Sequence, residues 1–132
     1  MEKLIIKVCA SKDSFGAYSE NCDVIFAAGD SLDACKKDVF NAIEALKASW
    51  KEEDIPAILK GEFEIEWKYD IQTILMHYTQ YFSLAGLQRL TGINQRQLWN
   101  YANGFSKPRQ AASDKITKAL QGLGEELITL SL

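Results

Sequence analysis

The period of the hydrophobic pattern changes once along this chain, at Asp70, and that change constrains the fold more than any other feature. Before it, residues 62–67 (EFEIEW) alternate strictly between acidic and apolar side chains, which is typical of a strand with one buried face. After it, apolar residues recur at the spacings of three and four found on one face of a helix: Ile71, Ile74, Leu75, Tyr78 and Phe82. The sequence therefore predicts an α+β protein, with one domain over residues 1–69 and an all-helical domain over residues 70–132.

The first 69 residues predict the element order β-β-β-α-β. Short runs of apolar, β-branched and aromatic residues over 3–9, 15–19 and 24–28 favour three strands, with turn residues at 21–23. Ser31 then stands where it can cap a helix that runs to about Ser49. The apolar stripe of this helix, which must cover the sheet, comprises Leu32, Cys35, Val39, Ala42, Ile43, Leu46 and Trp50.

Charge is distributed unevenly between the two predicted domains. Residues 1–69 hold nine lysines and fourteen acidic residues, a net charge of −5, whereas residues 70–132 carry +2. Within residues 83–118, six Lys and Arg side chains stand against Asp114 alone. An acidic domain repels phosphate and a basic segment attracts it, so we expect any nucleic-acid contact in the second domain.

Residues 83–104 (SLAGLQRLTGINQRQLWNYANG) predict two short helices joined by a tight turn. Ser83 and Asn94 are placed to cap the two helices, and Gly92 stands where such a turn needs a positive φ. The residues expected to point inward are Leu84, Leu87, Leu90, Ile93, Leu98 and Tyr101. This pattern is typical of a helix-turn-helix unit, whose second helix enters the major groove of DNA.

The outward face of the second helix separates a DNA-binding unit from a plain αα-hairpin, which would also bury leucines around a turn glycine. This face carries amide and guanidinium groups, which pair bidentately with adenine and guanine edges, whereas an ordinary solvated face carries Glu and Lys. Trp99 could stack on the DNA backbone or pack beneath Phe105, and the sequence leaves both open. The candidate DNA-binding residues are Ser83, Asn94, Gln95, Arg96, Gln97, Trp99, Asn100, Asn103, Lys107 and Arg109.

Within this set, we expect Gln95, Arg96 and Asn100 to contact base edges, and Lys107 and Arg109 to contact phosphates. One helix-turn-helix reads only a few base pairs, so we expect a homodimer on an inverted-repeat operator in double-stranded DNA. Residues 127–132 (LITLSL) alternate with a period of two and could form a C-terminal strand at the dimer seam, or pack on their own chain.

Residues 83–123 resemble the Cro/Xre class of helix-turn-helix domains. The matching residues are Leu87, Gly92, Ile93, Asn94, Leu98, the pair Asn103 and Gly104, and the loop 105–109 (FSKPR). As in that class, the loop leads into a further helix, with Ala112, Ile116, Ala119 and Leu120 facing inward. One position departs from the class: the residue after Leu87, commonly a small alanine where the helices cross, is Gln88.

The first domain resembles the HicB antitoxin domain, a partial ribonuclease-H-like fold. The matching residues are 16–18 (GAY), 28–33 (AGDSLD) and 42–43 (AI), whereas residues 21–23 (NCD) replace the family's usual Pro-Asp-x-x-Gly stretch. Together the two resemblances imply a cytoplasmic, antitoxin-like repressor that binds its own operator and holds a small basic ribonuclease toxin. The alternative is a stand-alone transcriptional regulator whose first domain only dimerises or senses a ligand.

The residues argue against an enzyme, a metal site and a cofactor. A ribonuclease-H-type nuclease needs carboxylates that converge on two metal ions, one of them from its first strand, and residues 4–9 hold none. The glutamates at 62, 64 and 66 project from one strand, and His77 has no nearby Cys or Ser partner. The three cysteines, at 9, 22 and 35, form no C-x-x-C pair and fit apolar positions in a reducing compartment. No apolar run approaches the roughly 20 residues of a membrane span, so we expect no membrane partner.

Overall fold

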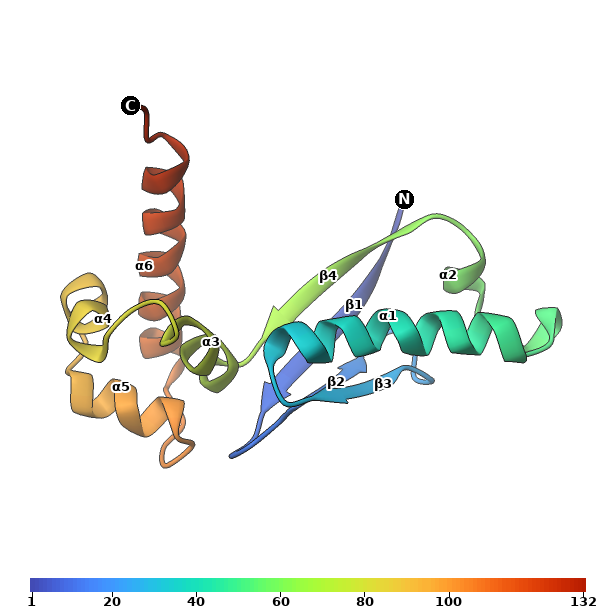
Figure 1. Ribbon diagram of the computed structural model, residues 1–132, viewed down its shortest axis with the longest axis horizontal. Coiled ribbons are helices and arrows are strands. Elements are labelled where there is room, and N and C mark those ends of the chain that lie inside the picture. The colour runs from blue at the N-terminus through green and yellow to red at the C-terminus, as the bar shows by residue number, and fades with distance from the viewer. The chain divides into compact units, whose positions relative to one another are not determined.

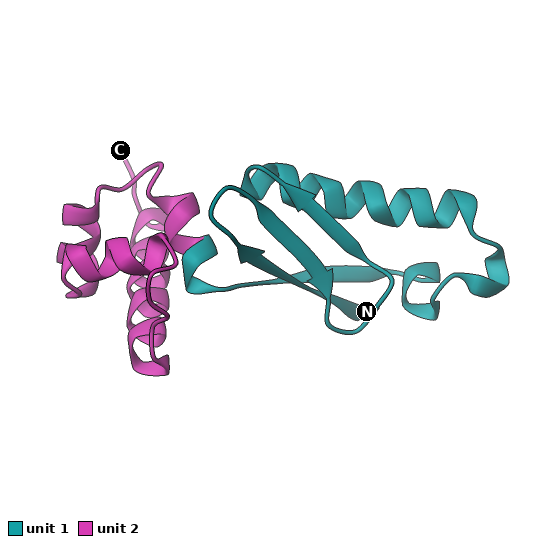
Figure 2. Ribbon diagram, turned by 90° about the horizontal axis from the view of Figure 1, so that it is seen from below, with its two compact units in different colours: residues 1–73 teal, residues 74–132 magenta.

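The computed structural model describes all 132 residues, which form two compact units, residues 1–73 and 74–132 (Figures 1 and 2). The α+β class is confirmed, since the first unit contains the whole sheet and the second is helical. The first unit extends to Thr73 because two groups after the last strand bond to the Val8 carbonyl oxygen: the Asp70 N–H at 3.3 Å and the Thr73 hydroxyl at 3.4 Å. No helix combines the length and apolar composition that a membrane span requires.

Four strands form one sheet in the order β3-β2-β1-β4: β1 (Glu2–Ala10), β2 (Phe15–Ser19), β3 (Phe26–Gly29) and β4 (Phe63–Tyr69). β1 pairs antiparallel with β2 and parallel with β4, and β2 pairs antiparallel with β3. The expected order β-β-β-α-β is present, with a 3-10 turn η1 (Glu52–Asp54) and a short helix α2 (Ala57–Lys60) inserted before β4. The third strand begins at Phe26 rather than at 24, because the Ile25 N–H bonds to the Cys22 carbonyl at 3.2 Å and closes a turn there.

Helix α1 (Leu32–Ser49) lies across β2 and β3 and covers one face of the sheet (Figure 1). Ser31 caps it as expected, since its hydroxyl accepts the Ala34 N–H at 3.0 Å. Gly29 allows the helix to start close to β3, because a Cβ atom there would lie 2.5 Å from the Cys35 backbone nitrogen. The buried residues between helix and sheet include Leu4, Ile6, Val8, Phe15, Ala17, Cys35, Val39 and Ile43.

The placement of Trp50 on the buried stripe of this helix is wrong. Trp50 follows the last helical residue, and its backbone is extended, with φ −88° and ψ 151°. It therefore leaves the helical face that packs on the sheet, and its side chain is 42% exposed.

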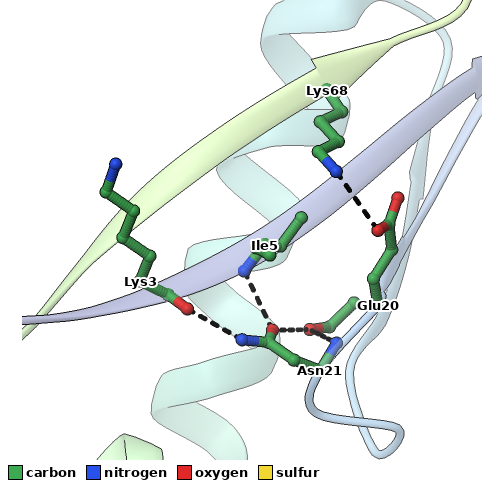
Figure 3. Close-up of polar contacts among 6 residues, drawn as sticks. Lys3, Ile5, Glu20, Asn21 and Lys68 are labelled. Atoms are coloured by element: carbon green, nitrogen blue, oxygen red, sulfur yellow. Dashed lines mark hydrogen bonds and ion pairs between the residues drawn. The ribbon is translucent and has the colours of Figure 1, made fainter.

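A side chain completes the pairing of β1 beyond the end of β2 (Figure 3). Asn21 Nδ2 donates to the Lys3 carbonyl at 2.8 Å, and Asn21 Oδ1 accepts the Ile5 N–H at 2.9 Å. The Ser19 hydroxyl holds this amide in place by donating to Asn21 Oδ1 at 3.1 Å and accepting the Asn21 N–H at 3.3 Å. The segment that replaces the Pro-Asp-x-x-Gly stretch thus satisfies backbone groups that β1 would otherwise leave unpaired.

The second unit contains most of α3 (Ile71–Tyr78) and all of α4 (Leu84–Thr91), α5 (Gln95–Ala102) and α6 (Gln110–Ile128). Asp70 caps α3 through its side chain, which accepts the Thr73 N–H at 2.8 Å. α4 packs on both α5 and α6. The buried apolar residues of the unit are Leu75, Leu87, Leu98, Tyr101 and Ile116.

Three expectations about this unit are wrong. α3 ends at Tyr78, which is 39% exposed, so Phe82 does not lie on the apolar face of that helix. Leu90 does not point inward but is 36% exposed, because Thr91, one helical turn after Leu87, occupies the buried position. Residues 127–132 do not form a strand, since α6 continues to Ile128 and the Thr129 N–H still bonds to the Glu126 carbonyl at 3.2 Å. The helix satisfies these backbone groups within the chain, whereas a six-residue strand has no neighbouring strand to pair with.

Candidate DNA interface

The turn between α4 and α5 has the geometry that the sequence predicts. Gly92 adopts φ 77°, in the left-handed region, and its N–H donates to the Gln88 carbonyl at 2.8 Å. Thr91 adds a contact that the sequence analysis did not find. Its buried hydroxyl donates to the Leu87 carbonyl at 2.7 Å and accepts the Ile93 N–H at 3.1 Å. Hydrogen bonds from both Thr91 and Gly92 thus hold the turn.

Two side chains bind the first N–H groups of α5. Asn94 caps the helix as expected, since its Oδ1 accepts the Arg96 N–H at 2.8 Å. Gln88 Oε1 accepts the Gln95 N–H, also at 2.8 Å. Gln88 stands where the Cro/Xre class commonly has an alanine. Its side chain therefore connects α4 to α5 and helps to cap α5.

Four of the ten candidate residues have side chains engaged in hydrogen bonds within the unit. The Ser83 hydroxyl caps α4 by accepting the Gly86 N–H at 2.9 Å, and Asn94 caps α5. Gln97 Nε2 donates to the Ser106 hydroxyl at 3.2 Å, which ties α5 to the following loop. Asn103 Nδ2 donates to the Trp99 carbonyl at 2.9 Å at the end of α5. These side chains position the helix and have fewer free groups for a ligand.

Trp99 stacks on Phe105, which is one of the two alternatives that the sequence left open. The two ring centroids lie 5.3 Å apart with an interplanar angle of 21°. The guanidinium carbon of Arg96 lies 5.7 Å from the Trp99 ring centroid on the outer surface of α5. Phe105 is 71% exposed and Trp99 is 41% exposed. Phe105 was missed as a site residue, although its aromatic side chain in a polar loop could have marked it.

The remaining five candidates, Gln95, Arg96, Asn100, Lys107 and Arg109, are different, because their side chains accept or donate no hydrogen bond and form no ion pair within the chain. Gln95, Arg96, Lys107 and Arg109 are exposed, and Asn100 is half-buried. A shallow hollow of about 320 Å³ lies beside them and is lined by Leu84, Gln95, Arg96 and Trp99.

Little negative charge opposes the basic groups around this surface. Asp114 is the only acidic residue in 83–118, and its carboxylate accepts a hydrogen bond from Gln110 Nε2 at 2.8 Å. Arg109 precedes α6, whose first N–H groups have no side-chain cap. Cationic side chains and unpaired helix N–H groups are the usual partners of backbone phosphates.

Other reactive side chains do not assemble into a site. No group of three or more His, Cys, Asp and Glu residues is placed to hold a metal ion. His77 packs edge-to-face on Tyr78 and Tyr81, at 4.9 and 5.9 Å between ring centroids. Burial raises the pKa of the Cys35 thiol, and the nearby Asp38 carboxylate raises it further. Burial also raises the pKa of the Cys22 thiol. Both thiols stay protonated and poorly nucleophilic near neutral pH.

Comparison of the chain with protein-family models, with curated proteins and with solved structures finds no match.

Proposed function

We propose that the protein is a sequence-specific DNA-binding repressor of the antitoxin type, which binds its operator through α5. The observation that carries the proposal is the division of polar side chains on and around this helix. Some are engaged in caps and in the link to the following loop, whereas the side chains of Gln95, Arg96 and Asn100 form no hydrogen bond or ion pair in the chain. A short, rigidly capped helix that presents unpartnered amide and guanidinium groups matches the needs of base recognition in the major groove.

Each free side chain has a distinct role in this proposal. Arg96 donates two hydrogen bonds to a guanine, and Gln95 or Asn100 pairs with an adenine edge. Lys107 and Arg109, in the loop after α5 and at the start of α6, contact phosphates and fix the orientation of the helix. Trp99 and Phe105 form an exposed aromatic pair beside Arg96 that packs against sugars or thymine methyl groups. A homodimer places two such helices on the halves of an inverted repeat.

The first unit supports the antitoxin part of the proposal through its charge. Its net charge of −5 over residues 1–69 suits a basic partner such as a small ribonuclease toxin. Exposed carboxylates occur both on the uncovered face of the sheet, at Glu64 and Glu66, and on α1, at Asp33 and Glu44. Such a surface speeds the association of an oppositely charged protein and makes it sensitive to salt.

The DNA-binding proposal is tested by selection from a pool of random duplexes with the full-length protein. The expected result is enrichment of an inverted repeat with half-sites about one helical turn apart. Arg96→Ala should enrich a site that is relaxed at one base pair of each half-site. Lys47→Ala, which removes an exposed charge from α1, serves as the control and should enrich the same site as the wild type. Failure of the wild-type protein to enrich any sequence would contradict the proposal.

The antitoxin proposal is tested by co-expression with the protein encoded in the neighbouring small reading frame. Capture of a small basic ribonuclease by the full-length protein is expected, together with loss of capture when Glu64, Glu66 and Glu44 are changed to glutamine. If the neighbouring frame encodes no basic protein, or capture survives these changes, the docking role of the first unit is wrong. The stand-alone regulator then becomes the better description.

A further inference from the structure

β4 forms one edge of the sheet, and its outer side has no partner in the chain (Figure 1). The Asp70 N–H, just after the strand, donates to the Val8 carbonyl of β1. Because backbone direction alternates along a strand, even-numbered residues of β4 point their N–H and C=O groups toward β1 and odd-numbered residues point theirs outward. The outward groups belong to Phe63, Ile65, Trp67 and Tyr69, and none bonds to another part of the chain. β4 is thus an open edge of seven residues.

The side chains of the same residues are also incompletely covered. The β1 neighbours of Ile65, Trp67 and Tyr69 are fully buried, and these neighbours are Leu4, Ile6 and Val8. The four residues of β4 are only half-buried, including Phe63 at the start of the strand. α1 packs mainly on β3 and β2. It reaches β4 through Phe40 and through Lys36, whose Nζ lies 4.8 Å from the Trp67 ring centroid and 5.6 Å from that of Tyr69. There Phe40 packs edge-to-face on Trp67, at 6.1 Å between ring centroids, yet Phe40 remains 51% exposed. Phe40 and the four β4 side chains form an apolar strip that borders the open edge.

The charges on the other face of β4 match an antiparallel copy of the same strand. Glu64, Glu66 and Lys68 alternate with the apolar residues and are exposed. In an antiparallel pair centred on Glu66, all seven residues are paired and Glu64 lies opposite Lys68 of the other copy, twice by symmetry. Opposite charges directly across two strands attract. A strand face that carried charges of only one sign would repel a second copy of itself. The face of β4 carries both signs, in an order that places opposite charges across the two strands.

Two local contacts bear on this pairing. Lys68 Nζ lies 3.4 Å from Glu20 Oε2, but both side chains are well exposed (Figure 3). An exposed ion pair of this kind contributes little, so Lys68 can turn toward a second carboxylate at small cost. Glu66 would lie opposite its own copy at the two-fold axis, and this is the one like-charge pair in the register.

We propose that the protein forms a two-fold dimer in which β4 pairs antiparallel with β4 of a second copy. The two sheets then join into one of eight strands, with both α1 helices on the same face. The two apolar strips meet between those helices, with Ile65 opposite Trp67 and Phe63 opposite Tyr69 of the other copy. This places the dimer seam in the first unit, and the inference does not depend on DNA binding.

The test is sedimentation of the full-length protein without DNA. The wild type is expected to be a dimer. Glu64→Lys and Lys68→Glu each place like charges opposite one another twice, and each should raise the dissociation constant about tenfold. The double variant Glu64→Lys/Lys68→Glu restores both pairs and should restore the dimer. Glu66→Gln removes the like-charge pair at the axis and should tighten it.

The matched control is Glu53→Lys, the same change of charge at an exposed residue of the 3-10 turn η1, which should leave the dissociation constant unchanged. Circular dichroism checks that every variant is folded. A monomeric wild type, or a dimer that neither single reversal weakens, overturns the proposal. A dimer that is lost only on truncation after Gly124 also overturns it, because the seam then lies at the end of α6.

Discussion

Replacing Gln88 by alanine removes the only side-chain bond from α4 to the first turn of α5, the Gln88 Oε1 contact with the Gln95 N–H at 2.8 Å. A hydrogen bond of this kind contributes about 0.5–1.5 kcal/mol, similar to a helix cap. The Gln95 N–H lies near the surface, so water recovers part of the loss, and alanine is the better helix former by a few tenths of a kcal/mol. We therefore expect a net loss of about 0.5–1 kcal/mol, which lowers the melting temperature by about 2–4 °C.

The control is Gln121→Ala on α6, where the glutamine is exposed and makes no hydrogen bond. Thermal unfolding of the full-length protein should show almost no shift for this variant. Gln88→Glu keeps the acceptor and adds a negative charge near the N-terminus of α5, so it should retain stability. The same charge lies beside the proposed phosphate contacts, so this variant should bind DNA more weakly at low salt. Equal melting temperatures for Gln88→Ala and Gln121→Ala would refute the capping role of Gln88.

Three further groups of variants test other parts of the structure. Arg96→Ala should cost about 1–3 kcal/mol of DNA binding and relax specificity at one base pair. Lys107→Ala should weaken binding to all DNA sequences alike and reduce the slope of log affinity against log salt concentration by about one. An unchanged slope would remove Lys107 from the phosphate contacts. Gly29→Ala should lower the denaturant midpoint strongly, because its Cβ would lie 2.5 Å from a backbone nitrogen of α1; an unchanged midpoint contradicts this packing. The folded pKa of the Cys35 thiol is raised above its value of 9.0 in an unperturbed chain, so its contribution to stability is complete below about pH 9 and is lost as the pH rises. Cys35→Ala should therefore flatten the fall in stability above about pH 9. Identical slopes for the two proteins in that range would show that the thiol does not contribute.

The parts of the fold that the sequence predicted correctly depend on local chemistry. Ser31, Ser83 and Asn94 cap helices in the structure. A Ser or Asn side chain just before an amphipathic helix is well placed to accept a hydrogen bond from an N–H of the first turn. Gly92 adopts the positive φ that the turn requires. The strict alternation over residues 62–67 correctly predicted a strand, since β4 exposes its glutamates and half-buries the apolar residues between them.

The errors arose where a pattern fits more than one structure. Residues 127–132 alternate with a period of two, but Leu127 and Leu130 are also three apart, so the segment can extend a helix equally well. Because α6 is already formed from Gln110, each added residue gains a backbone bond, and the helix continues to Ile128. Trp50 was placed on the stripe of α1 by spacing alone, and the spacing does not show that the helix ends at Ser49.

The candidate site exposes a limit of a different kind. An amide side chain that reads a base and one that ties two segments together look the same in a sequence. Gln95 and Gln97 are two residues apart, yet Gln97 bonds to Ser106 while Gln95 has a free side chain on the outer surface. The roles of Gln95 and Gln97 can be distinguished only from the position of Ser106 in space, because Ser106 lies in a loop nine residues after Gln97. The same reasoning applies to Gln88, because the sequence does not show that its side-chain oxygen accepts the first N–H of α5. The proposed DNA interface is therefore defined by the polar side chains that form no hydrogen bond or ion pair within the chain, which belong to α5 and to the loop that follows it.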